Sequence, residues 1–141
     1  MSRLLKKGIW PIALVICLGI VVWLSRSGEA SPVPLVSTLE KNGYRIEVRT
    51  LEARSSPMEE KQFLVTVTDV GGANVEATSI QIKSWMPKMF CGIFTAKVER
   101  SSQGSGYEGT LVPVMSGRWV AETRVRIGSD EFVLLHDYKV V

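Results

Sequence analysis

Residues able to bind a soft metal ion gather in one short segment of this sequence. Met86, Met89 and Cys91 lie within six residues of one another, and Met115 follows further along the chain. Thioether and thiolate groups are soft ligands, which select Cu(I). The single histidine of the chain, His136, could add an imidazole ligand. These residue types point to a copper site made of Met86, Met89, Cys91 and Met115.

Packing is the alternative interpretation of the same residues. Methionine fills irregular gaps in protein cores, and a lone cysteine commonly behaves as a small buried hydrophobe. Pro87 removes a hydrogen-bond donor from the backbone and therefore predicts that a strand ends beside Met86. The segment from Met86 to Cys91 is then a loop at one end of the domain, where binding residues commonly lie. Both interpretations stay open on the sequence alone.

Enzymatic chemistry is not expected. One histidine, one cysteine after residue 17 and no recognisable pair of acids leave no triad to build. The glycines lie in turn-forming segments and form no phosphate-binding loop. We therefore expect no catalytic residues and no cofactor other than the candidate copper ion.

Hydrophobic residues alternate with polar ones in several segments after residue 38, as in half-buried strands. In residues 44–48, for example, Tyr44, Ile46 and Val48 share one face. The same period recurs in residues 63–68, 80–83, 119–127 and 131–140, and turn-forming residues occupy 69–72, 101–106, 116–117 and 128–130. This pattern predicts an all-β domain, an immunoglobulin-like antiparallel sandwich of about seven strands.

Short motifs between Phe63 and Val125 resemble those of the YtkA-like domain, which is related to the FixH group. In chain order they are Phe63-Leu-Val-Thr-Val-Thr-Asp69, Gly71-Gly72 with Val75, Met86-Pro87-Lys88-Met89, Gly106-Tyr107 and Met115-Ser116-Gly117-Arg118-Trp119. The resemblance implies a bacterial immunoglobulin-like domain that is exported or membrane-anchored. It also implies links to copper handling and cytochrome oxidase assembly. Many relatives carry His or further Met after Met-Pro-x-Met, whereas this chain continues with Phe90-Cys91-Gly92-Ile93.

An apolar run near the N-terminus predicts a single transmembrane anchor. No charge interrupts the 18 residues from Gly8 to Ser25, which span ~27 Å as a helix. Trp10 and Trp23 lie near the two ends of the run, as in an aromatic belt. Arg3, Lys6 and Lys7 precede the run, so the positive-inside rule places the N-terminus in the cytoplasm. A cleaved signal peptide is the alternative interpretation of the same segment.

The expected organisation is therefore a basic cytoplasmic tail (1–8), an anchor (9–25), a linker (26–38) and an extracytoplasmic β-sandwich domain (39–141) at the cell membrane. Residues 1–28 carry four basic residues and no acidic ones, whereas residues 29–141 carry the other 13 basic and all 14 acidic residues. The domain has no basic excess, which argues against a nucleic-acid partner. Two functions remain open: a membrane-anchored binding module for copper handling or oxidase assembly, or a metal-free domain that binds a membrane protein.

Overall fold

The computed structural model describes residues 32–102 and 104–141. The predicted anchor, residues 9–25, lies outside this part of the chain. Within the described residues, no helix has the length and apolarity needed to cross a membrane. Residues Val33–Val141 form one compact unit. Its described residues form nine strands: β1 (Val36–Lys41), β2 (Tyr44–Thr50), β3 (Lys61–Asp69), β4 (Ser79–Trp85), β5 (Phe94–Thr95), β6 (Lys97–Arg100), β7 (Tyr107–Leu111), β8 (Gly117–Ile127) and β9 (Asp130–Val140).

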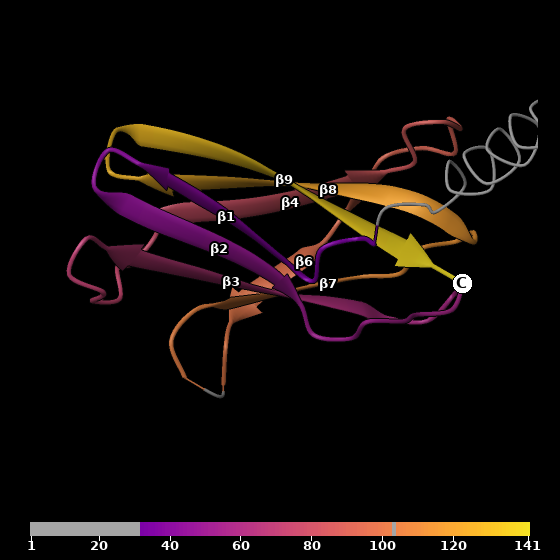
Figure 1. Ribbon diagram of the computed structural model, residues 1–141, viewed down its shortest axis with the longest axis horizontal. Helices are drawn as coiled ribbons and strands as arrows, with labels where there is room; N and C mark the ends of the chain where they lie inside the picture. Colours follow the sequence, from indigo (N-terminus) through magenta and orange to yellow (C-terminus); the bar gives the residue numbers. More distant parts are fainter. Residues whose placement is uncertain (1–31, 103) are drawn as a thin grey trace, which may run out of the picture. The chain divides into compact units, whose positions relative to one another are not determined.

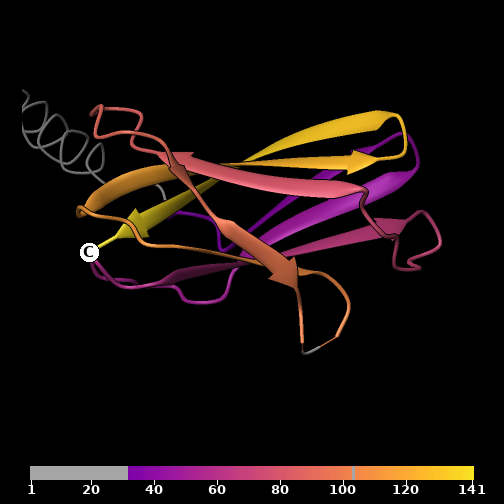
Figure 2. The same ribbon diagram turned by 180° about the vertical axis from the view of Figure 1, so that it is seen from behind.

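The strands form two antiparallel sheets that pack face to face (Figures 1 and 2). The first sheet has the order β1-β2-β3-β7-β6, and the second has the order β5-β4-β8-β9. All the pairings between neighbouring strands are antiparallel. The expected all-β, immunoglobulin-like sandwich is thus confirmed.

Strand alternation builds the core between the two sheets. Phe63, Val65 and Val67 of β3 are buried and face the core. The residues between them are half-buried and lie on the opposite face of the strand. Trp119 of β8 and Tyr138 of β9 are also buried and stack with ring centroids 6.3 Å apart. Phe63 meets Tyr138 edge to face at 5.2 Å, so aromatic contacts join the two sheets.

The structure has more strands than the sequence pattern predicted. β1 begins at Val36, inside the range assigned to the linker, and pairs with β2 through the turn at Asn42 and Gly43. β5 has only two residues and β6 only four, and they belong to different sheets. Segments this short are too brief to show a hydrophobic period, which explains why they escaped the pattern.

Several loops far apart in the sequence lie at the same end of the sandwich. The register pairs the end of β4 (Trp85) with Val120 of β8, and the start of β8 (Gly117) with the end of β9 (Val140). Residues 86–93, named here the Met loop, therefore lie at the same end as residues 112–116 and the C-terminus (Figure 1). Residues 33–35 and 51–60 lie there too, since backbone hydrogen bonds join Thr50 to Leu35 and Val141 to Ser55. We call this the Met-loop end.

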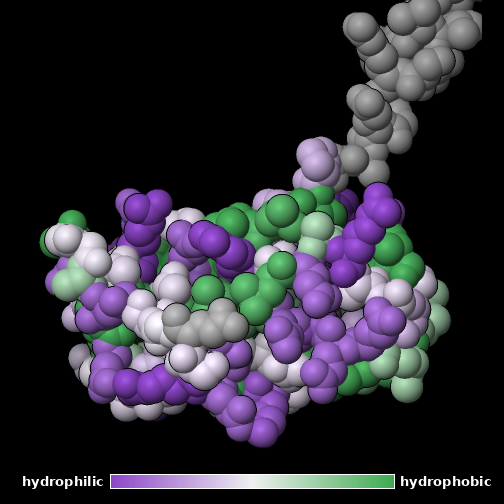
Figure 3. Space-filling view, turned by 90° about the horizontal axis from the view of Figure 1, so that it is seen from below, coloured by the Kyte–Doolittle hydropathy of each residue, from purple (hydrophilic) through white to green (hydrophobic). Residues whose placement is uncertain are grey.

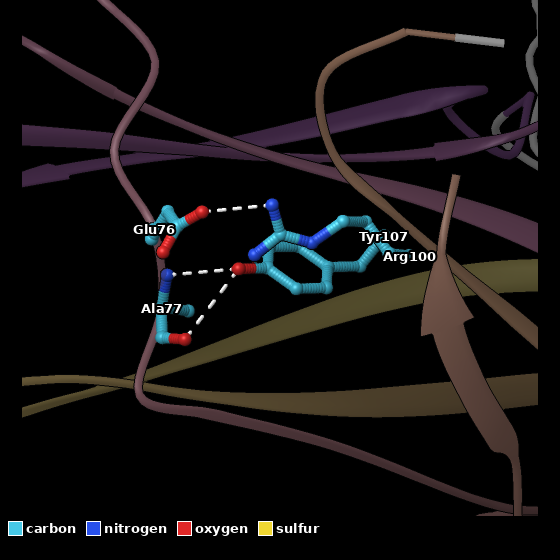
Figure 4. A network of polar contacts seen from close by, with 4 residues as sticks. All are labelled: Glu76, Ala77, Arg100 and Tyr107. Carbon is cyan, nitrogen blue, oxygen red and sulfur yellow. Dashed lines mark hydrogen bonds and ion pairs between the residues drawn. The ribbon is translucent and has the colours of Figure 1, made fainter. Parts of the chain in front are cut away.

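Tyr107, which belongs to one of the family-like motifs, has a structural role (Figure 4). The Tyr107 hydroxyl accepts a hydrogen bond from the Ala77 backbone N–H at 3.0 Å and donates one to the Ala77 carbonyl. Arg100 stacks over the Tyr107 ring at 5.8 Å and pairs with Glu76 at 2.7 Å. This ion pair lowers the pKa of Glu76. Tyr107 thus fastens the connection between β3 and β4 onto the start of β7, an inner strand of the first sheet.

Candidate functional site

The Met loop begins where Pro87 predicts it, directly after β4 ends at Trp85. Two backbone hydrogen bonds shape it, from Met89 N–H to the Met86 carbonyl and from Cys91 N–H to the Met89 carbonyl. Gly92 has a φ of 109°, which only glycine adopts readily, so the chain reverses there. The loop then returns to the edge of β4 as β5.

The four sulfur-containing side chains do not all face the same way. Met86 and Cys91 are partly buried and pack against the core, whereas Met89 is 51% exposed and Met115 is 40% exposed. Met86 also reaches the segment that carries Met115, because a β-carbon on Gly117 would come within 2.5 Å of its Cε. The structure therefore joins the Met86 and Met115 segments and turns Met89 outward.

Trp119 holds the Met115 segment in place. Its indole N–H donates a hydrogen bond to the Met115 carbonyl at 3.0 Å. Its ring is fully buried and meets Phe94 edge to face at 5.5 Å. The core thus positions both segments that flank the candidate site, since Phe94 follows the Met loop and Met115 precedes β8.

Tyr138 and Ser84 form a buried polar pair under the Met loop. Ser84 donates its proton to the Val120 carbonyl at 2.8 Å, so the Tyr138 hydroxyl is the donor in the 2.7 Å bond to Ser84 Oγ. Burial raises the pKa of Tyr138 to about 12, and the nearby Cys91 thiol acts in the same direction. Tyr138 is therefore a neutral hydrogen-bond donor beside Cys91 at physiological pH.

The candidate donor set meets only part of the requirements of a metal ion. In residues 32–102 and 104–141, no group of three or more His, Cys, Asp or Glu side chains is placed to hold one. The sulfur atoms of Met86, Met89, Cys91 and Met115 have the soft character that Cu(I) prefers. Of these, Met86 reaches the segment that carries Met115, Cys91 packs against the core, and Met89 is half exposed. The chemistry suits Cu(I), but the packing turns Met89 away from Met86 and Cys91.

His136 does not join this set. It is fully buried in β9, and its Nδ1 is hydrogen-bonded to the Ser37 hydroxyl of β1 at 2.8 Å. Its Nε2 has no hydrogen-bond partner among the described residues. The Met loop extends from β4, and β8 separates β4 from β9 in the sheet. His136 instead links the two sheets along the seam between β1 and β9.

The burial of His136 predicts that the domain loses stability in mild acid. Burial lowers the pKa of His136, and the nearby Lys61 charge adds to this effect while Asp137 opposes it. The unfolded chain, whose histidine pKa is about 6.5, then binds the proton more readily than the folded domain. The contribution of His136 to the free energy of unfolding is therefore fully present above about pH 6.5. Below that pH this contribution falls, by at most about 1.4 kcal/mol per pH unit.

Urea unfolding of wild type and His136→Gln, each at neutral pH and in mild acid, measures this effect. Glutamine does not titrate, so the variant should lose that part of the pH dependence while the acidic groups keep theirs. An identical pH dependence in both proteins would show that His136 is not responsible.

Lys61 was not recognised from the sequence as an interior residue. It begins β3 on the same face as Phe63 and is only 1% exposed. Its ammonium group donates a hydrogen bond to the Glu52 carbonyl, which ties β3 to residues 51–60. Burial lowers the pKa of Lys61, and the Glu52 charge partly offsets this. The sequence did hold a signal of this inward position, because Lys61 lies two residues before Phe63 in an alternating strand.

An apolar patch made by part of the Met loop and the end of β4 was also missed. Phe90 is 93% exposed and Ile93 is 62% exposed. Together with Trp85 they border a surface hollow of about 470 Å³, which Lys83 and Glu122 flank. We call Trp85, Phe90 and Ile93 the loop patch. Trp85 shares its strand face with Gln81 and Lys83, and this parity was the signal that it points outward.

Comparisons with known proteins support the fold alone. No family model matches the sequence, and no curated protein does; the resemblance to YtkA-like domains therefore stays a prediction. A DUF4426 family protein from Pseudomonas aeruginosa has a similar structure, with a TM-score of 0.59, 12% identity, and coverage of 73% of this chain and 94% of that one. FetP from uropathogenic E. coli is also similar, with a TM-score of 0.52 and 11% identity. The match covers 74% of this chain and 93% of FetP.

A DUF4785 family protein from Legionella pneumophila is also similar, with a TM-score of 0.52 and 12% identity. The match covers 71% of this chain but only 29% of that longer one. At such identities the likeness extends to architecture and not to activity. The chain is thus an immunoglobulin-like two-sheet sandwich that resembles the DUF4426, FetP and DUF4785 proteins in fold.

Proposed function

We propose that this protein is a membrane-anchored, non-enzymatic binding module whose β-sandwich lies outside the cytoplasm and binds a membrane protein through the loop patch. The observation that carries the proposal is the exposure of Phe90, a large aromatic side chain that is 93% accessible. A fully exposed phenylalanine gains nothing for folding, since burial is what makes an apolar side chain stabilising. Exposed aromatic residues next to a hollow are typical of binding surfaces.

The charges around the loop patch favour a protein partner. Lys83 and Glu122 lie on the outer face of the second sheet and flank the hollow. One basic and one acidic residue beside an aromatic centre make a polar rim around an apolar core, which is the usual anatomy of a protein interface.

Site-specific photo-crosslinking in intact cells tests this proposal. A photoreactive amino acid at Phe90 should give a discrete adduct with one membrane protein. The matched control is the same amino acid at Val70, which is 90% exposed but lies in the turn after β3 at the opposite end. Adding Ile93→Asp should reduce the adduct roughly tenfold, as expected when a charge enters an interface centre. Equal labelling at both positions, or none at Phe90, would refute the proposal.

Cu(I) binding is the second candidate function, and the contact of Met86 with Gly117 favours it because that contact joins two sulfur-bearing segments. The full-length protein in nanodiscs would be titrated with Cu(I) beside a variant with Met86, Met89 and Met115 changed to Leu and Cys91 changed to Ser. If copper is a ligand, the wild type binds it more tightly. Equal affinity would exclude this function.

A further inference from the structure

Exposed apolar side chains are concentrated at the Met-loop end of the sandwich. Among the described residues, 14 large hydrophobic side chains are exposed, and ten of them lie at this end; the other four are Val36, Val70, Val133 and Leu135. In Figure 3 hydrophobic surface is visible at the right-hand end and also at the left-hand end and near the centre, between hydrophilic residues that cover much of the broad face. Single exposed hydrophobic residues are ordinary, but a concentration of them at one end is not.

Six of these ten side chains form a group distinct from the loop patch, which we call the apolar rim. They come from the start of the domain, from residues 51–60, from the connection between β7 and β8, and from the C-terminus: Leu35, Leu51, Met58, Val112, Val114 and Val141. Backbone hydrogen bonds tie these segments together: Thr50 to Leu35 at 3.0 Å, Met58 to Pro113 at 2.7 Å and Val141 to Ser55 at 2.9 Å. The rim is therefore one built surface made from four segments.

Met58 occupies an unusual place in this rim. Its φ is 65°, in the left-handed region that costs free energy for residues with a β-carbon. The hydrogen bond from its N–H to the Pro113 carbonyl holds this conformation, and the side chain is nevertheless 70% exposed. In this strained backbone conformation, the flexible apolar side chain of Met58 therefore points into solvent and is not buried.

The connection to the N-terminal segment decides which occupant suits the rim. The chain enters the domain at Val33, so two rim residues lie beside the point of entry: Leu35, and Leu51 through the hydrogen bond from Thr50 to Leu35. Only residues 26–31 separate the predicted anchor from Pro32, and six residues reach no further than about 22 Å. A domain tethered this closely keeps its point of entry near the headgroups, and exposed apolar side chains there would meet the bilayer interface.

We propose that the apolar rim rests in the outer interface of the membrane, with Met58 and Leu51 inserted among the lipids. This inference rests on the proposed membrane anchoring. It deepens that proposal by orienting the sandwich, since the Met-loop end then faces the bilayer and the turns at Asn42, Gly72 and Gly128 face away. The adjacent loop patch would meet a partner at the membrane surface.

The test uses the full-length protein in phosphatidylcholine liposomes, with Cys17 and Cys91 changed to Ser and a single cysteine introduced by Met58→Cys. An environment-sensitive fluorophore on that cysteine should be quenched roughly twofold or more by lipids that carry a nitroxide on the acyl chain, as expected for a group at the interface. The matched control is Val70→Cys, whose label lies at the opposite end and should not respond. Circular dichroism checks that both variants keep the β-sheet spectrum.

Each outcome separates the two proposals. Quenching at position 58 but not at 70 supports the inference. If the protein stays in the liposomes but the label at 58 responds no more than the label at 70, the inference is overturned and the proposed anchoring still holds. The label at 58 could instead be shielded from solvent, not quenched by the nitroxide lipids, and exposed when the protein is diluted in lipid. That result would mean that the rim contacts a second copy of the chain, and it would also overturn the inference. Release of the unlabelled chain from liposomes by alkaline carbonate contradicts the anchoring itself.

Discussion

Replacing Trp119 with alanine is expected to lower the free energy of unfolding by about 3–5 kcal/mol. The side chain is fully buried and packs against Phe94 and Tyr138. Truncation removes these contacts and leaves a cavity that the two rigid sheets cannot close. It also removes the hydrogen bond to the Met115 carbonyl, so the segment before β8 should loosen.

Urea unfolding of the wild type and Trp119→Ala measures this loss. Trp85→Ala is a matched control, since it deletes the same ring from the outer, half-exposed face of β4. We expect a loss of about 1 kcal/mol or less for the control, as for most surface substitutions. Similar losses in the two variants would contradict the assignment of Trp119 to the centre of the core. Binding of the membrane partner should respond in the opposite order, because Trp85 belongs to the loop patch.

Gly106→Ala is expected to destabilise the domain by about 2–4 kcal/mol, from backbone strain and a steric clash together. Gly106 has a φ of 127°, which residues with a β-carbon rarely adopt. A β-carbon there would also lie 2.8 Å from the Val65 carbonyl oxygen. The backbone of a central strand cannot move aside without breaking its pairing, so the turn before Tyr107 must shift.

Gly104→Ala separates the two contributions. Gly104 has a similar φ of 149°, but a β-carbon added there would meet nothing within 4 Å beyond its chain neighbours. The control should therefore show only the conformational cost, about 1 kcal/mol. Thermal unfolding of both variants gives the comparison. Equal losses of stability in the two variants would mean that the β-carbon at position 106 avoids the Val65 carbonyl without destabilising the domain. They would also mean that the Tyr107 contacts do not depend on this turn.

The architecture could largely be read from hydrophobic periodicity. The long strands β2, β3, β8 and β9 alternate strictly, because one face of each packs against the opposite sheet, and Pro87 marks the end of β4. The edge strand β1 and the short strands β5 and β6 lack that signal. They exist because neighbouring strands offer hydrogen-bonding partners, which is a property of the assembled sheet.

The candidate site could be located from the sequence but not oriented. Residue types alone identified Met86, Met89, Cys91 and Met115 as soft ligands. Whether such side chains converge depends on packing, and the fold turns Met86 and Cys91 toward the core while Met89 points to solvent. Similarly, strand parity could place His136 on one face of β9, but only the approach of β1 gave it Ser37 as a partner.

The sequence by itself determined the strand periods, the soft-ligand loop, and the separation of a basic apolar N-terminal segment from a nearly neutral domain, because these depend on the order of residues along the chain. Only the tertiary structure decided that the Lys61 ammonium group reaches the Glu52 carbonyl, that His136 links two sheets, and that four distant segments form one apolar rim. The physical reason is that burial and surface patches arise from contacts between residues far apart in sequence, which local patterns do not encode.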